Sequence, residues 1–207
     1  MVWEHNLKLK IGNKPLVRDN KYKYLGLLLD EKLIWRDHLL ELRAKLRKLN
    51  FLFFHLKSYY NTKHLRKLYL PLYESTMTYG IIHWEGSKHI EAIKVLQNKV
   101  CRNILSLAPR TTESIIYSKM KVMGLEDLYK YRLRMFVIKN LGLFALHHNN
   151  YMHTRQADAR MIEIPTWWKE HSRWQAGYRG PSLYNNLPGS VRGEKRLSAF
   201  KRLIKMS

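Results

Sequence analysis

The spacing of apolar residues along this chain first changes near Trp35. Before that point, residues 7–11 alternate apolar with basic side chains, Gly12 and Asn13 supply a turn, and residues 22–29 form a second, increasingly apolar run. A period of two is typical of strands, whose successive side chains point to opposite faces. The opening segment therefore predicts a small antiparallel hairpin or ribbon, with residues 22–29 as one extended run.

From Trp35 onward, apolar residues recur every three or four positions, which is the period of a helix. The first such segment predicts a long helix with one apolar stripe, and this stripe should pack inward. The stripe consists of Leu39, Leu42, Leu46, Leu49, Phe53 and Leu56.

The next two helical segments are bounded by residues that cap or interrupt helices. One begins at Thr62, a candidate N-cap, and Pro71 should kink or interrupt it because proline lacks a backbone N–H. Its apolar side is formed by Leu65, Leu68, Leu72 and Tyr79. The other extends from about Ser87 to about Leu107 and stops before Pro109. Its apolar side is formed by Ile90, Ile93, Leu96, Val100 and Ile104.

Two more helices complete this part of the chain. A short one should follow Thr111-Thr112-Glu113, and a long one should extend from Glu126 to about His147, weakened locally by Gly142. The apolar face of the long helix consists of Leu128, Leu133, Phe136, Val137, Leu141 and Phe144. The predicted fold is therefore mainly helical, with a hairpin segment at 1–34 and a helical bundle at 35–148.

Residues 149–207 are predicted as a third module, an irregular and basic tail rich in aromatic residues. Proline and glycine interrupt this segment, and a helical period returns only near Leu197. Aromatic side chains alternate here with basic ones, a composition suited to stacking on unpaired bases. Trp168, Trp174 and Tyr178 are the stacking candidates, and the alternative is that these rings only pack the tail onto the bundle.

Charge narrows the choice of partner. Lys and Arg number 38 against 16 Asp and Glu, which gives a formal net charge of +22. Self-repulsion of this size is relieved by a polyanion, so nucleic acid, as RNA, DNA or an RNA–DNA hybrid, is the expected partner. A membrane surface is the rival, but no apolar run approaches the roughly 20 residues that a spanning helix needs.

Basic residues on the hairpin and the first two helices are the candidates for contacts with phosphates. On the first helix, only Glu41 offers a favourable partner, four residues before Lys45, so most of the charge lacks a partner within the helix. About half of the candidates should be ordinary solvated bases, since phosphate contacts depend on the face presented. The candidates are Lys10, Lys14, Arg43, Lys45, Arg47, Lys48, Lys57, Lys63, Arg66 and Lys67.

The residues of a catalytic centre are not recognisable in the sequence. A polymerase or nuclease centre needs carboxylates clustered around divalent ions, whereas Asp19, Asp30, Asp37, Asp127 and Asp158 are scattered. The adjacent acids at 30–31 and 126–127 are explained as a turn acid and as favourable charge at a helix start. We therefore expect no catalytic residue, no cofactor and no activity from this chain alone.

A zinc site is also not expected. The densest group of possible ligands is His147, His148 and His153, beside the single cysteine Cys101, and no Cys-x-x-Cys pair exists. Adjacent histidines on a helix point about 100° apart, so they are poorly placed to share one ion. A lone cysteine and the absence of a signal-peptide pattern at the start predict an intracellular location, nuclear or cytoplasmic.

The segment 23–30 contains Tyr-Leu-Gly followed by Leu-Asp, and the segment 33–35, which ends in Trp, and His38 come next. This order resembles the signature that follows the palm in reverse transcriptases of non-LTR retrotransposons, the LINE-like and jockey-like elements of animals. The resemblance continues through Leu68-Tyr69, Tyr79-Gly80 with Trp84, the segment 96–102, Thr154-Arg155, the segment 178–188 and Phe200-Lys201.

The resemblance implies a primer-grip-like role for residues 7–29 and a thumb-like role for 35–107, which would clasp a template–primer duplex. The family's palm, with its aromatic-x-Asp-Asp motif and Mg²⁺ ions, would lie before Met1, and it is a possible partner of this chain. Tyr184 stands where the family usually has Trp.

Two functions fit these sequence features. The chain resembles a fragment of an RNA-directed DNA polymerase that binds nucleic acid without its catalytic palm. Alternatively, it is a host-retained module that binds nucleic acid or docks a protein partner. A basic structural protein, such as a ribosomal one, is disfavoured because such chains seldom combine this many Trp and Tyr with long helices.

Overall fold

The computed structural model describes residues 10–15, 19–144, 161–164, 176–194 and 196–206. As expected, the fold is mainly helical with small N-terminal antiparallel hairpins. The strands are β1 (Lys10–Ile11), β2 (Lys14–Pro15), β3 (Lys21–Tyr24) and β4 (Leu27–Asp30). The first helices are α1 (Arg36–Leu56), α2 (Thr62–Leu68), the π-helical turn η1 (Tyr69–Glu74), α3 (Ser75–Thr78) and α4 (Ile81–Trp84). They are followed by α5 (Glu91–Leu105), α6 (Glu113–Met120), α7 (Leu125–Lys139), the 3₁₀ turn η2 (Leu141–Leu143), α9 (Ala176–Asn185), α10 (Gly189–Arg192) and α11 (Leu197–Met206).

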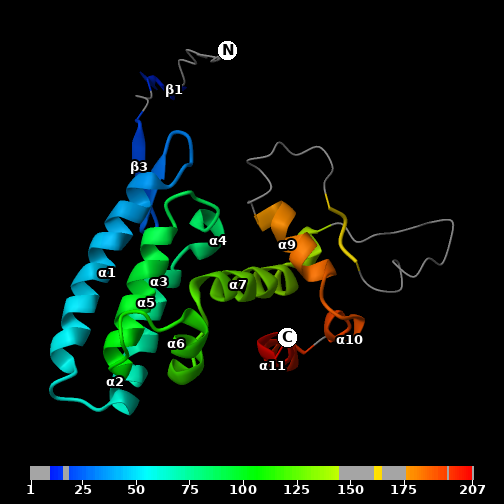
Figure 1. The fold of residues 1–207 in the computed structure, drawn as a ribbon. Coiled ribbons are helices and arrows are strands. Elements are labelled where there is room, and N and C mark those ends of the chain that lie inside the picture. Colours follow the sequence, from blue (N-terminus) through cyan, green and yellow to red (C-terminus); the bar gives the residue numbers. More distant parts are fainter. Residues whose placement is uncertain (1–9, 16–18, 145–160, 165–175, 195, 207) are drawn as a thin grey trace.

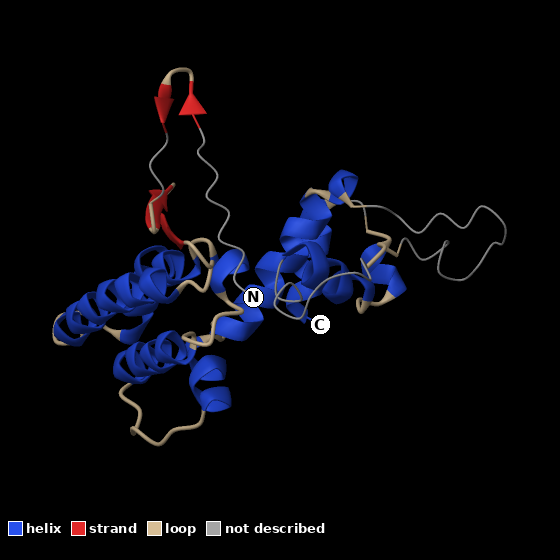
Figure 2. Ribbon diagram, turned by 90° about the horizontal axis from the view of Figure 1, so that it is seen from above, coloured by secondary structure: helices blue, strands red, loops and turns tan. Residues whose placement is uncertain are grey.

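The helices form two groups that meet at α7. Helices α1 and α5 lie side by side with α2 and α3, and α7 crosses beside them (Figure 1). Helices α9, α10 and α11 lie on the other side of α7 and share with it a smaller hydrophobic cluster. The second hairpin, β3–β4, packs against α1, whereas the first, β1–β2, stands away from the helices, as the view from above shows (Figure 2). The division into segments 1–34, 35–148 and 149–207 stays a prediction.

The opening segment contains two hairpins, so the expectation of one extended run at 22–29 is wrong. β1 pairs with β2 and β3 pairs with β4, both antiparallel. The chain reverses at Leu25 and Gly26, whose φ angles are 45° and 82°. Two successive positive φ angles match the two-residue turn that suits the twist of a hairpin, and glycine reaches this region without strain. Residues 7–9 lie outside the described part.

The carboxylate of Asp30 holds the connection between β4 and α1. It accepts hydrogen bonds from the backbone N–H groups of Lys32, Ile34 and Trp35, at 3.1, 3.0 and 2.8 Å. This confirms the interpretation of Asp30 as a turn acid. The other acidic pair, Glu126 and Asp127, lies in the first turn of α7, as expected from the helix dipole.

Helix α1 has the predicted apolar stripe. Leu39, Leu42, Leu46 and Phe53 are buried, and Leu49 and Leu56 are partly buried against the same core. Burial of such side chains contributes about 1.5–3 kcal/mol each, so this stripe is a large part of what holds α1 to the bundle.

The interruption expected at Pro71 takes the form of the π-helical turn η1. The residues that face the core are four apart, namely Leu65, Tyr69, Tyr73 and Met77. A wider turn keeps residues of this spacing in line, whereas a regular helix would rotate them off one face. The prediction placed Leu72 and Tyr79 on this face and was wrong, because both are exposed, at 40% and 54%.

Several predicted helix ends shift by a few residues. The N-cap of α2 is Asn61, whose side chain accepts from the N–H of His64, and Thr62 is the first helical residue. Helix α5 begins at Glu91, four residues after the expected Ser87, whose hydroxyl donates to the carbonyl of Ile34. Helix α7 ends at Lys139, well before the expected His147. At this end, the side chain of Asn140 donates to the carbonyl of Phe136.

The tail is more helical than its composition predicts. Helix α9 contains Pro181, and Gly180 on the same helix lies against α7. A Cβ added at Gly180 would come within 2.8 Å of the Val137 side chain, so glycine here permits close packing of α9 on α7. The punctuation by glycine and proline predicts irregular structure, and at α9 this prediction is wrong.

His38 links the second hairpin to α1. Its ring is 6% exposed, and Nδ1 accepts from the backbone N–H of Leu28 at 3.4 Å. The ring lies edge-on to Trp35 at 6.0 Å and is tilted against Trp84 at 6.3 Å. Protonation of Nδ1 would remove the acceptor of the Leu28 hydrogen bond and would place a positive charge between these rings.

We expect stability to fall in mild acid because of His38. Burial lowers the pKa of His38 from its ordinary value, the nearby Lys45 and Lys23 lower it further, and Glu41 opposes them. The unfolded chain therefore binds the proton first as pH falls, so stability present above about pH 6.5 is lost below it. Urea denaturation measures the free energy of unfolding at each pH. Between neutral pH and about pH 5, this free energy should fall less for His38→Gln than for the wild type. An equal loss in both proteins would show that His38 is not the group that titrates.

Candidate nucleic-acid interface

A large hollow in the described surface is a groove between α1 and α5, with a volume of about 1010 Å³. It is apolar at its base and carries basic and aromatic side chains along its walls. We call it the α1–α5 groove. It is lined on α1 by Arg43, Arg47, Asn50, Phe51 and Phe54, and on α5 by Ala92, Val95, Leu96, Lys99, Val100 and Asn103.

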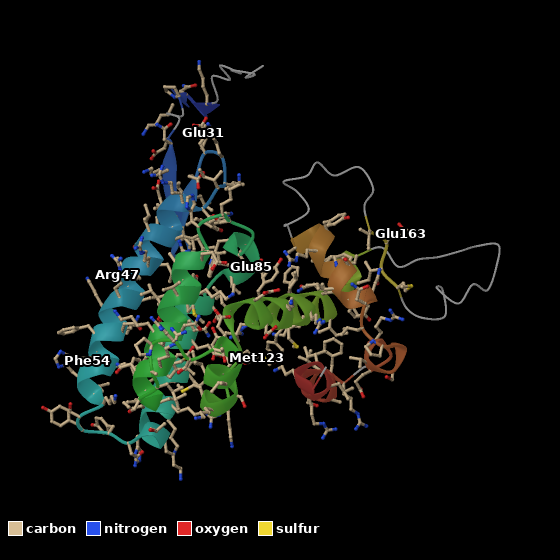
Figure 3. All side chains as sticks on the ribbon, in the orientation of Figure 1. Glu31, Arg47, Phe54, Glu85, Met123 and Glu163 are labelled. Carbon is tan, nitrogen blue, oxygen red and sulfur yellow. The ribbon has the colours of Figure 1, made fainter. Side chains whose placement is uncertain are left out.

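Helical periodicity explains why these α1 side chains share one wall. Arg47 follows Arg43 by four residues, and Phe54 follows Arg47 by seven, so the three lie on one face of the helix. This face is adjacent to the buried stripe and not part of it. Figure 3 shows Arg47 and Phe54 both projecting outward from α1.

Three cations border the groove, namely Arg43, Arg47 and Lys99. Arg47 and Lys99 are exposed and Arg43 is half-buried. Within the described ranges, no ion pair joins any of the three to a carboxylate, and no carboxylate lines the groove. Their positive charge is therefore available to an anion from outside the described chain.

Exposed aromatic rings are concentrated near the C-terminal end of α1. Phe51 is 67% exposed and Phe54 is 62% exposed. The ring of His55 lies edge-on to both, with centroid distances of 4.3 Å to Phe51 and 5.6 Å to Phe54. Beyond the helix end, Tyr59 is 82% exposed. The sequence interpretation missed this cluster, although Phe51 and Phe54 fall outside the apolar stripe of α1.

The other basic candidates on α1 and α2 lie elsewhere. Lys45 forms the expected pair with Glu41, at 3.4 Å. The guanidinium of Arg66 donates to the carbonyl of Lys121 at 3.0 Å, which ties α2 to the end of α6. Lys48, Lys57, Lys63 and Lys67 are exposed and do not line the groove.

The hairpin and tail candidates are separate from the groove. Lys10 and Lys14 are exposed. In the first hairpin, Lys10 lies opposite Pro15 and Lys14 lies opposite Ile11. Trp168 and Trp174 lie outside the described residues, as do His147, His148 and His153. Tyr178 lies on α9 and is half-buried. The structure thus brings Arg43 and Arg47 together with Lys99, and adds Phe51 and Phe54.

Reactive groups of the described chain are few. Burial raises the pKa of the Cys101 thiol to about 12, so it stays protonated at neutral pH. Among the described residues, no three His, Cys, Asp or Glu side chains gather where they could hold a metal ion. In the same part of the chain, no helix combines the length and apolar character needed to cross a membrane.

Comparisons of the chain with models of protein families, with curated proteins and with solved structures found no match. The geometry of the α1–α5 groove is therefore the main basis for a functional proposal.

Proposed function

We propose that this chain is a nucleic-acid-binding unit that corresponds to the thumb and tail of a non-LTR reverse transcriptase and holds a template–primer through the α1–α5 groove. In this proposal the catalytic palm, with its carboxylates and Mg²⁺, belongs to another polypeptide segment. The chain described here supplies affinity and position, and its residues carry no step of nucleotide transfer.

The observation that carries the proposal is the charge of the groove. Arg43, Arg47 and Lys99 border one hollow, and no described carboxylate lines it. Each cation that meets a phosphate releases condensed counterions, and this release supplies most of the affinity in binding that does not read sequence. The formal net charge of +22 adds long-range attraction for a polyanion.

The salt dependence of binding tests this proposal. If the three groove cations engage three phosphates of a hybrid duplex, the slope of log affinity against log salt should be about −2.7. Affinity for a labelled RNA–DNA hybrid should then fall roughly 40-fold when salt rises from about 50 to about 200 mM. Fluorescence anisotropy measures this directly. Affinity that does not change with salt would contradict the proposal.

The apolar base of the groove supports a second candidate, a host-retained module that docks a protein partner. Phe51 and Phe54 would then be covered by apolar side chains of that partner, as in helix-in-groove recognition. Binding at an interface of this kind depends less on salt than phosphate binding does. The same salt titration, made with a protein partner in place of the hybrid, therefore separates the two functions.

A further inference from the structure

We propose that the α1–α5 groove takes a single strand with unpaired bases, which stack on Phe51 and Phe54 while the phosphates lie along Arg43, Arg47 and Lys99. This inference rests on the proposed nucleic-acid function and deepens it, because it names the form of nucleic acid that the groove selects. It places the preference for unpaired bases on α1, not on the tail.

The exposure of the two rings is the first argument. Phe51 and Phe54 keep 67% and 62% of their surface exposed, whereas Phe53 between them is fully buried. Exposed phenylalanine rings have no polar group that water could satisfy, so covering them is favourable. A base presents a flat π-face of matching size, and such stacking tolerates any base. His55, edge-on to both rings, holds the pair in one cluster.

The position of the cations is the second argument. Arg43 and Arg47 are four residues apart, which corresponds to about 6 Å along the axis of α1. Successive phosphates on one strand have a comparable spacing. The two arginines therefore form a row that leads to the rings, and Lys99 adds a cation from α5 on the opposite wall.

A duplex can place its phosphates on the groove cations, but it cannot also present the faces of its internal bases to the rings. In a duplex both faces of each internal base are covered by its neighbours, so Phe51 and Phe54 would meet only sugars and phosphates. A single strand can turn its bases toward the rings while its phosphates stay on the arginines, as strand-binding grooves with aromatic platforms do. An acidic peptide could satisfy the cations, but it offers no stacked series of flat faces.

The test uses the full chain and three labelled probes of equal length. They are an oligothymidylate of roughly 10 nucleotides, its abasic counterpart with the same phosphates, and a blunt RNA–DNA hybrid. We expect the oligothymidylate to bind at least about 25-fold more tightly than the abasic strand, because bases stack on two rings and each stacked base contributes about fivefold or more. The hybrid should bind more weakly than the oligothymidylate at equal salt.

Variants assign the effect to the rings. The double variant F51L/F54L keeps apolar side chains and should lose at least about tenfold in affinity for oligothymidylate while its affinity for the abasic strand is unchanged. Leu52→Ala is the matched control, since Leu52 is 40% exposed on the same helix but does not line the groove. This control should bind all three probes like the wild type, and circular dichroism checks that each variant is folded.

The outcomes separate the inference from the proposed function. If oligothymidylate, abasic strand and hybrid bind equally, and F51L/F54L changes nothing, the single-strand inference is overturned while nucleic-acid binding stands. If no probe binds at low salt, both fail. If an acidic helical peptide binds the groove and oligothymidylate does not, the surface is a protein-docking site and the inference is again overturned.

Discussion

Replacement of Phe53 by alanine is expected to lower the free energy of unfolding by about 3–5 kcal/mol. The Phe53 ring is 0% exposed and lies at the centre of the larger hydrophobic core. It meets Tyr69 and Tyr73 edge-on, with centroid distances of 6.5 and 6.3 Å, and those two rings stack on each other at 5.3 Å. Truncation would remove both ring contacts and would leave a cavity in a close-packed region.

The neighbouring residue supplies the control. Phe54 is 62% exposed, so Phe54→Ala should change the free energy of unfolding by no more than about 0.5 kcal/mol. Urea denaturation followed by far-ultraviolet circular dichroism compares the two variants with the wild type. A large loss in Phe54→Ala, or a small one in Phe53→Ala, would mean that α1 is rotated relative to the orientation described here.

The long helices were predictable because their apolar residues repeat with the helical period. The stripe from Leu39 to Phe53 identified both the existence of α1 and its buried face. Elsewhere the period was less informative. The spacing of four between Leu65, Tyr69 and Tyr73 is not the period of a regular helix, and only the wider turn at η1 keeps these residues on one face.

The elements that the sequence did not reveal depend on contacts between distant segments. At Gly26, an apolar run continues on both sides, so the turn between β3 and β4 resembles an uninterrupted strand. At Gly180, the helix-breaking composition is offset because a residue without Cβ lets α9 approach Val137. Local propensity favours a loop there, and tertiary packing overrides it.

The candidate site was predictable only in part. Arg43 and Arg47 were among the basic candidates, because their charge has no partner on α1. Lys99 was not, since it comes next to the arginines only when α5 packs against α1. Phe51 and Phe54 could have been found from their position outside the apolar stripe. The alternation of aromatic and basic residues instead favours the tail, where Tyr178 is half-buried.

Charge reversal in the groove is expected to have the largest effect on binding. The double variant R43E/R47E should weaken binding of a labelled strand on the order of 100-fold at low salt, because it replaces two phosphate contacts by two repulsions. The slope of log affinity against log salt should also become shallower by about 1.4 for a single strand, or by about 1.8 for a duplex. Anisotropy titrations at several salt concentrations measure both quantities.

A matched double variant distinguishes local contacts from general attraction. K119E/K201E changes the net charge by the same amount, and both lysines are exposed and lie outside the groove, on helices other than α1 and α5. Screening limits their influence to about 10 Å at moderate salt, so this variant should lose only a few-fold in affinity and keep the wild-type slope. Equal losses in the two double variants would mean that net charge, and not the α1–α5 groove, holds the polyanion. A much larger loss in R43E/R47E would place the phosphates on the wall beside Phe51 and Phe54.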